Sequence, residues 1–172
     1  MMRHDARRLY PLMLAALLSV IAGCGYHVAG KGSKMPGGIT SVSIPVFTNA
    51  TYKPDIEPAV TRAFVDEFVN TLKVTDSGDV VMRGTIKGYA LTPVSYTQND
   101  VNQEYRLTIA ISLVLTKDGN NVIWQDDDIT NYSDFAVNIS DVTATKDAEL
   151  AALKKIAADT ARFTKERMME DF

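Results

Sequence analysis

Apolar and polar residues alternate along four segments of the chain, which is typical of strands that bury one face in a core. The first segment runs from Ile39 to Phe47, with Val42, Ile44 and Val46 predicted to lie on its buried face. Pro45 has no amide hydrogen to donate, so this strand is expected at a sheet edge or beside an irregularity.

A second strand follows the turn residues Asp76-Ser77-Gly78-Asp79. We expect it to bury Val80, Met82, Ile86 and Ala90, which alternate with polar side chains. The third strand has the clearest alternation in the chain, and its predicted inward side chains are Tyr105, Leu107, Ile109, Ile111, Leu113 and Leu115. Asp118-Gly119-Asn120 then predicts a hairpin turn into a fourth strand that reaches about Tyr132.

Two other segments have the four-residue spacing of an amphipathic helix. The first predicted helix starts at Asp55, which we expect to cap it, and has Pro58 in its first turn. Its apolar stripe consists of Ile56, Val60, Phe64, Phe68 and Leu72.

The second predicted helix follows a predicted loop over residues 133–144 and opens at Thr145. The side chains expected to point inward are Leu153, Ile156, Ala157 and Phe163.

These elements predict an α+β fold in the order strand, helix, three strands, helix. One face of a four-stranded sheet is enough to bury both apolar helix faces, which gives a two-layer sandwich. The first strand is expected to be parallel to its neighbour and the other three antiparallel, so the sheet is mixed. The opposite sheet face is polar.

The first 23 residues have the zones of a bacterial signal peptide. Arginines precede an apolar run from Leu9 to Ile21, which is too short to favour a permanent membrane span. Ile21-Ala22-Gly23-Cys24 resembles a lipobox, so we expect cleavage before Cys24 and attachment of diacylglycerol and an N-acyl chain, such as palmitate, to that residue. Gly25 rather than Asp follows it, which favours the outer membrane. Residues 24–38 are expected to be a flexible lipidated tether, and residues 39–172 a single domain.

Composition excludes several classes of function. The formal net charge is −3, and the first 23 residues contain three arginines and one aspartate, so the mature chain is more acidic still. This argues against nucleic-acid binding. Cys24 is the only cysteine, so no internal disulfide forms. His27 would be the only histidine after cleavage and lies in the tether, so we expect neither an enzyme nor a cofactor.

The chemistry that remains is charge on the polar sheet face and in one acidic run. Arg83 and Lys87 lie on that face, and Arg106 across the ladder would complete a candidate site for an anion, with a solvated sheet face as the alternative. In the run Asp126-Asp127-Asp128, the first and third side chains are expected to share a face, without the glycine-bearing loop of a calcium site. We predict no metal there, and the role of the run stays open between a solvated edge and a contact for a partner.

The chain resembles the LptE family of lipopolysaccharide-assembly lipoproteins. The resemblance rests on the order and spacing of Cys24-Gly25-Tyr26-His27, the Ile39 to Phe47 strand, Tyr105-Arg106-Leu107, Ile123-Trp124 and Lys146-Asp147. It implies a protein that plugs the outer-membrane barrel LptD, helps it to assemble, and takes part in delivering lipopolysaccharide to the cell surface. The domain would lie on the periplasmic side of the outer membrane, within the barrel lumen, as a heterodimer with LptD.

The resemblance also implies basic contacts with lipopolysaccharide phosphates. Lys146 matches one of these positions. The second falls in the loop between the second and third strands, where Tyr96 and Thr97 are uncharged, so this loop would instead contact the barrel through aromatic and hydrogen-bond groups. The alternative function is an auxiliary lipoprotein subunit of an inner-membrane lipid transporter. A hydrolase that uses the aspartate run is a weaker third hypothesis.

Overall fold

The computed structural model describes Met35, residues 38–96 and residues 102–171. The predicted signal peptide, Cys24, most of the tether and Thr97 lie outside these residues. The fold described here belongs to one compact unit, residues 34–172. Its elements are β1 (Ser41–Ser43), β2 (Thr48–Asn49), α2 (Glu57–Phe68), β3 (Lys73–Val74), β4 (Val80–Tyr96), β5 (Asn102–Lys117), β6 (Asn121–Ala136) and α3 (Val142–Asp171).

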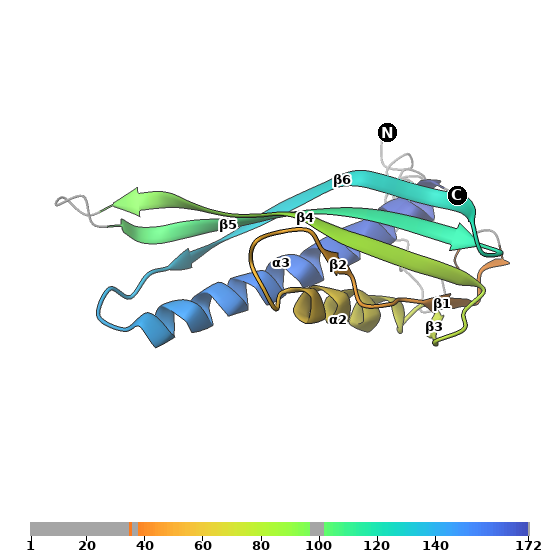
Figure 1. Cartoon of the computed structure of the whole chain (residues 1–172), viewed down its shortest axis with the longest axis horizontal. Helices are drawn as coiled ribbons and strands as arrows, with labels where there is room; N and C mark the ends of the chain where they lie inside the picture. Colours follow the sequence, from red (N-terminus) through yellow and green to blue (C-terminus); the bar gives the residue numbers. More distant parts are fainter. Residues whose placement is uncertain (1–34, 36–37, 97–101, 172) are drawn as a thin grey trace, which may run out of the picture. The chain divides into compact units, whose positions relative to one another are not determined.

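Helices α2 and α3 cover one face of a mixed sheet (Figure 1). The strand order is β3-β1-β4-β5-β6, with β2 beside β4. Strands β1 and β2 are parallel to β4, β3 is parallel to β1, and β4, β5 and β6 are antiparallel. The predicted α+β two-layer sandwich is therefore confirmed, but the sheet contains six strands within the described residues rather than four.

The two strands that the sequence did not predict are β2 and β3. Of the predicted Ile39 to Phe47 strand only Ser41–Ser43 forms a strand, and β2 begins directly after Phe47, so the irregularity expected at Pro45 is present. The break also changes the alternation, because Val46 is 67% exposed whereas Phe47 is buried. Strand β3 pairs with β1 through Lys73, whose amide donates to the Thr40 carbonyl at 3.1 Å.

The apolar stripe of α2 is buried as predicted, and Leu72 beyond its end is buried too. The predicted cap is wrong. Ile56 occupies the N-cap position without a side-chain hydrogen bond, and Asp55 has a φ of 60° that turns the chain into the helix. Met35, which the sequence placed in the tether, is buried in the core.

The long strands β4 and β5 show where alternation predicts burial and where it fails. The predicted inward side chains of β5 from Leu107 to Leu115 are buried. A bulge in β4 between Ile86 and Gly88 shifts the alternation by one residue. As a result Tyr89 is buried, and Ala90, which we predicted to point inward, is exposed.

The turn between β5 and β6 forms at the predicted residues. Asp118 and Gly119 have φ values of 51° and 87°, which is the backbone conformation that a tight hairpin turn requires.

Strand β6 is longer than expected and is paired only with β5 within the described residues. Two of its amides bond to neighbouring side chains instead of a strand. The Asp128 amide donates to Asp126 at 3.1 Å, and the Tyr132 amide donates to the Asn131 side chain at 2.8 Å. The predicted loop over residues 133–144 is therefore too long, because β6 continues to Ala136.

Helix α3 begins one turn earlier than predicted. Asp141 caps it by accepting a hydrogen bond from the Ala144 amide at 3.0 Å. Thr145 instead ties the preceding loop to the helix, because its hydroxyl donates to the Asn138 carbonyl at 3.1 Å. Phe163 is 51% exposed, so its predicted inward orientation is wrong. The buried positions are Ala152, Leu153, Ile156, Ala157, Thr160, Ala161, Thr164 and Met168.

The core is tightest where Phe47 lies over Gly84. A Cβ atom at Gly84 would lie 2.4 Å from the Phe47 ring, whose centroid is 5.0 Å from that of Phe64. We therefore expect Gly84→Val to lower the free energy of unfolding by about 1–3 kcal/mol, because overpacking displaces the ring. Gly88→Ala is the control, since its Cβ meets only Ala110 at 3.2 Å. Equal urea midpoints for the two variants would contradict this packing argument.

Asp79 fastens the start of β1 to the start of β4. Its carboxylate accepts hydrogen bonds from the Thr40 hydroxyl at 2.6 Å and from the Thr40 and Ser41 amides, each at 3.1 Å. The hydrogen bonds from Thr40, helped by those from Ser41, lower the pKa of Asp79 to about 2.

This shift predicts acid sensitivity at Asp79. Because the unfolded carboxyl has a pKa of about 3.9, the folded state gains stability above that value and loses it as the pH falls toward 2. Asp79→Asn should therefore remove part of the decrease in melting temperature between about pH 5 and about pH 2. Asp76→Asn is the control. A variant that keeps the full acid dependence would refute the contribution of this carboxylate.

Candidate functional site

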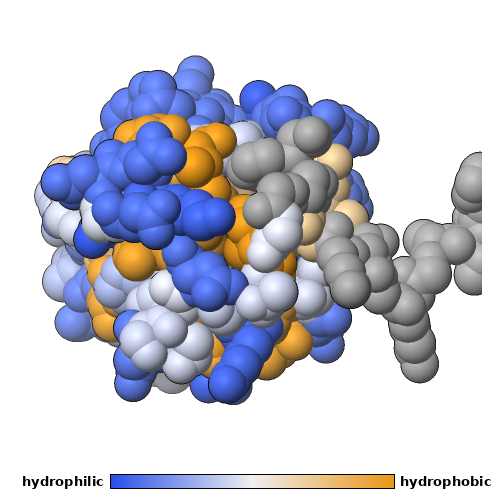
Figure 2. Space-filling view, turned by 90° about the vertical axis from the view of Figure 1, so that its right-hand side faces the viewer, coloured by the Kyte–Doolittle hydropathy of each residue, from blue (hydrophilic) through white to orange (hydrophobic). Residues whose placement is uncertain are grey.

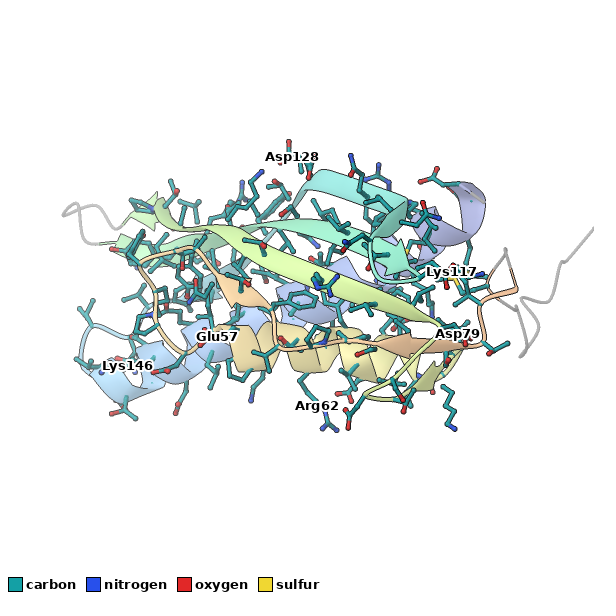
Figure 3. The ribbon with its side chains drawn as sticks, turned by 45° about the vertical axis from the view of Figure 1, so that its right-hand side comes forward. Glu57, Arg62, Asp79, Lys117, Asp128 and Lys146 are labelled. Atoms are coloured by element: carbon teal, nitrogen blue, oxygen red, sulfur yellow. The ribbon has the colours of Figure 1, made fainter. Side chains whose placement is uncertain are left out.

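Lys146 lies at one end of the sandwich, in the early part of α3 (Figure 3). The end of β4, the start of β5 and the loop between β6 and α3 gather at the same end (Figure 1). We call it the Lys146 end. Lys146 is exposed and borders a hollow of about 250 Å³. The other residues that line this hollow are Lys53, Pro54, Asp55, Ile56, Tyr89, Glu149, Leu150 and Leu153.

A charged cluster centres on Glu149 inside this hollow. The Lys53 ammonium is 2.7 Å from the Glu149 carboxylate, and the Tyr89 hydroxyl donates a hydrogen bond to the same oxygen. The Lys53 ammonium also lies 5.5 Å from the centroid of the Tyr89 ring. The Glu149 side chain is only 14% exposed, so this carboxylate is neutralised in a largely buried setting.

The titration of the cluster follows from these contacts. Burial raises the pKa of Glu149, but hydrogen bonds from Lys53 and Tyr89 and the charges of Lys53 and Lys146 outweigh it, so the net shift is downward. Burial, together with the hydrogen bond to Glu149 and its charge, raises the pKa of the Tyr89 hydroxyl. Glu149 therefore remains a carboxylate and Tyr89 remains a donor at neutral pH.

The loop between β2 and α2 holds Lys53 in place. The Asn49 side chain donates to the Lys53 carbonyl at 2.8 Å, and the Lys53 amide donates to the Thr51 hydroxyl at 3.2 Å. The Tyr52 hydroxyl donates to the Tyr89 carbonyl at 3.1 Å, which joins this loop to β4.

Large apolar side chains are exposed around the same end. Leu91 and Val94 lie on the last part of β4, Ile139 precedes α3, and Val142 and Leu150 belong to its first turns. The Lys146 end therefore combines cationic groups with exposed aliphatic groups, a combination that suits an amphipathic anion.

The other end of the domain is held together by polar contacts between β6 and α3. The Trp124 indole donates to Asp171 at 2.9 Å, and Arg167 forms an ion pair with Asp126. Figure 2 views this end and shows hydrophobic atoms that reach the surface between hydrophilic ones.

The three basic residues of the outer sheet face do not form one site. Arg83 pairs across the ladder with Val114, whereas Arg106 pairs with Thr92. Arg83 and Thr92 are nine positions apart along β4, so at about 3.3 Å per residue Arg83 and Arg106 are separated by roughly 30 Å. The predicted anion site from Arg83, Lys87 and Arg106 together is therefore wrong.

Each of these basic residues has a local partner instead. Arg83 donates to the Thr116 hydroxyl at 3.2 Å, and Lys87 donates to the Asp127 carbonyl at 3.1 Å. Arg106 makes two hydrogen bonds to Asp134, at 2.7 and 2.9 Å. This pairing raises the pKa of Arg106 and lowers that of Asp134.

The aspartate run forms a second bulge, because Ile129 pairs with Ile111 whereas Asp126 pairs with Leu113. The expectation that Asp126 and Asp128 share a face is wrong for this reason: Asp126 is largely buried against Arg167, and Asp128 is exposed. Among the described residues, no group of three or more potential metal ligands occurs.

The last two candidate residues, Tyr96 and Thr97, lie at the end of β4 and directly after it. Tyr96 ends β4 and pairs with Asn102, and Thr97 lies beyond the described range. Sequence reasoning found Lys146 through the family resemblance but missed Lys53, Tyr89 and Glu149. The hydroxyl of Tyr89 reaches this end because of the β4 bulge, and alternation alone gives no signal for that.

No helix in the described part of the chain is long and apolar enough to cross a membrane. The fold is that of a two-layer α+β domain, and a structure from Xanthomonas campestris shares it with a TM-score of 0.51 at 11% identity, over 77% of this chain and 87% of that one.

Two further solved structures are similar with lower scores. Rare lipoprotein B from Shewanella oneidensis has a TM-score of 0.48 and 16% identity, over 77% of this chain and 92% of that one. A minor lipoprotein from Acinetobacter baumannii has a TM-score of 0.48 and 10% identity over the same shares. No curated protein sequence matches this chain closely enough to count as a relative.

The family is settled by sequence. Residues 39–164 match the profile of the LptE family, described as lipopolysaccharide-assembly. The match covers well over half of the chain, which therefore belongs to the LptE family. The resemblance drawn from the sequence is confirmed, and the described role of the family is one of assembly.

Proposed function

We propose that this protein is an outer-membrane lipoprotein that plugs the LptD barrel, helps it to assemble, and takes part in delivering lipopolysaccharide to the cell surface. The observation that carries this proposal is the Lys146 end, where a cation without an ion-pair partner in the described part of the chain borders a hollow and aliphatic side chains of the same end are exposed. Lipopolysaccharide presents phosphates beside acyl chains, so both kinds of group have a counterpart there.

A plug must remain soluble in a wide aqueous lumen while it fills space, because large barrels otherwise leave an open channel. The outward faces of the helices suit that setting. Arg62 pairs with Asp66 on α2, and Asp159 on α3 lies 3.1 Å from both Lys155 and Arg162. These polar surfaces support a role in an aqueous lumen.

The lipid on Cys24 would supply the membrane attachment in this proposal. One acyl chain holds a protein only marginally, whereas two or more hold it stably. Mass spectrometry of the mature N-terminus should therefore find Cys24 with diacylglycerol and an N-acyl chain.

The matching genetic experiment uses two substitutions in the lipobox. Cys24→Ala should abolish recovery in the outer-membrane fraction, and Gly23→Ala, which keeps a small residue before the cleavage site, should not. An unmodified thiol on a freely soluble mature protein would rule out the anchor.

The partner is tested by affinity purification of the tagged full chain from detergent-solubilised envelopes. We expect LptD in stoichiometric amount. Recovery of a transporter ATPase or permease in its place would favour the alternative role as an auxiliary subunit of an inner-membrane lipid transporter.

Lys146 is tested by the binding of lipopolysaccharide micelles to the full mature chain. Lys146→Ala should weaken binding about fivefold, since one lysine near an anionic lipid surface contributes about 1 kcal/mol. Lys146→Arg should retain binding. Lys155→Ala is the control, because Lys155 is another exposed lysine of α3 but is paired with Asp159. Equal losses for Lys146→Ala and Lys155→Ala would mean that the contact is not specific to this end.

A further inference from the structure

Lys146 and Glu149 lie three residues apart on α3, and side chains at this spacing are neighbours on a helix surface. A lysine and a glutamate so placed commonly form an ion pair. Here they do not: Glu149 is paired with Lys53, and Lys146 makes no hydrogen bond or ion pair within the part of the chain that the structure describes.

Glu149 is instead held by two other side chains that line the hollow. The Lys53 ammonium, on the loop before α2, lies 2.7 Å from its carboxylate, and the Tyr89 hydroxyl on β4 donates to the same oxygen. Both contacts bridge segments far apart in sequence, since Lys53 is 96 residues from Glu149 and Tyr89 is 60 residues from it.

We propose that Lys53 and Tyr89 are positioning residues that hold the Glu149 carboxylate away from Lys146 and so keep the Lys146 ammonium available for a phosphate group of an anionic lipid. This inference rests on the proposed function, in which Lys146 contacts lipopolysaccharide. Lys53 acts on binding through Glu149 and does not itself touch the ligand.

The physical reason is the cost of an unpaired charge in a largely buried position. Without Lys53, the Glu149 carboxylate loses its nearest cation, and leaving such a charge uncompensated is unfavourable. Lys146, one helical turn away, is the cation best placed to replace Lys53, and its charge already contributes to the low pKa of Glu149. Pairing with Glu149 would then withdraw Lys146 from the ligand. Asp55 also lines the hollow, but its side chain is exposed and can be solvated by water.

The test is a double-variant cycle with the full mature chain and lipopolysaccharide micelles as the probe. Lys53→Met removes the charge but keeps an unbranched side chain of similar length. It should weaken binding about fivefold, as much as Lys146→Ala does, because Lys146 then pairs with Glu149 and no longer contacts the ligand. Adding Glu149→Gln to Lys53→Met removes the competing carboxylate and should restore binding to within about twofold of wild type.

Tyr89→Phe removes one of the two contacts with Glu149 and should give an intermediate loss. Lys53→Arg keeps the cation and should bind like wild type. With lipopolysaccharide from which the phosphates have been removed, Lys53→Met and wild type should bind equally. Melting temperatures of all variants separate a binding effect from unfolding, and the rescue by Glu149→Gln is not expected of a merely structural role.

Three results would overturn the inference. One is unchanged binding in Lys53→Met. Another is a loss that persists in the double variant, which would mean that Lys53 contacts the ligand directly or supports the fold. A Lys53 effect that remains with the dephosphorylated probe would equally refute it. If Lys146→Ala itself has no effect, the proposed lipopolysaccharide contact fails first, so the two failures are distinguishable.

Discussion

The structure depends on the burial of one face of three long antiparallel strands beneath two helices. Strand β5 lies between β4 and β6, and its inward side chains from Leu107 to Leu115 are almost completely inaccessible to solvent. At about 25 cal/mol per Å² of apolar surface, such a face contributes more than any of the ion pairs around it. Every other element is placed by its contact with this face or with its edges.

The same packing positions the Lys146 end. Helix α3 is long enough to lie along the whole sheet, so its first turns reach the end where β4 finishes (Figure 1). The β2–α2 loop comes to the same end because β2 pairs with β4 at Thr85 and Ile86, a short distance before the bulge. Three segments remote in sequence therefore surround Glu149, and their convergence follows from sheet register rather than from any local motif.

Local sequence patterns predicted the elements that depend on a regular period. The α2 stripe, the β5 alternation and the turn at Asp118-Gly119 required only neighbouring residues, and they agree with the structure. The errors occur where the period is interrupted. Because of the bulge at Lys87, Tyr89 is buried in place of Ala90. Because of the break at Pro45, Phe47 is buried in place of Val46.

The candidate site was less predictable than the fold for a related reason. Lys146 was identified from the family resemblance, but Lys53 and Glu149 carry no signal in an isolated sequence, where each reads as a solvated charge. Their pairing depends on tertiary contacts across 96 residues. The grouping of Arg83 with Arg106 failed because positions on one face of a long strand can share an orientation and still be far apart.

The edge of β6 that faces away from β5 affects how copies of the protein behave toward one another. Within the described residues β6 pairs only with β5, and a strand edge of this length without a partner is normally a template for adding another chain. Here the Asp128 and Tyr132 amides are already bonded to the side chains of Asp126 and Asn131, and a bulge with three successive carboxylates interrupts the edge. These features oppose edge-to-edge polymerisation, so copies of the domain at high local concentration are expected to remain separate molecules.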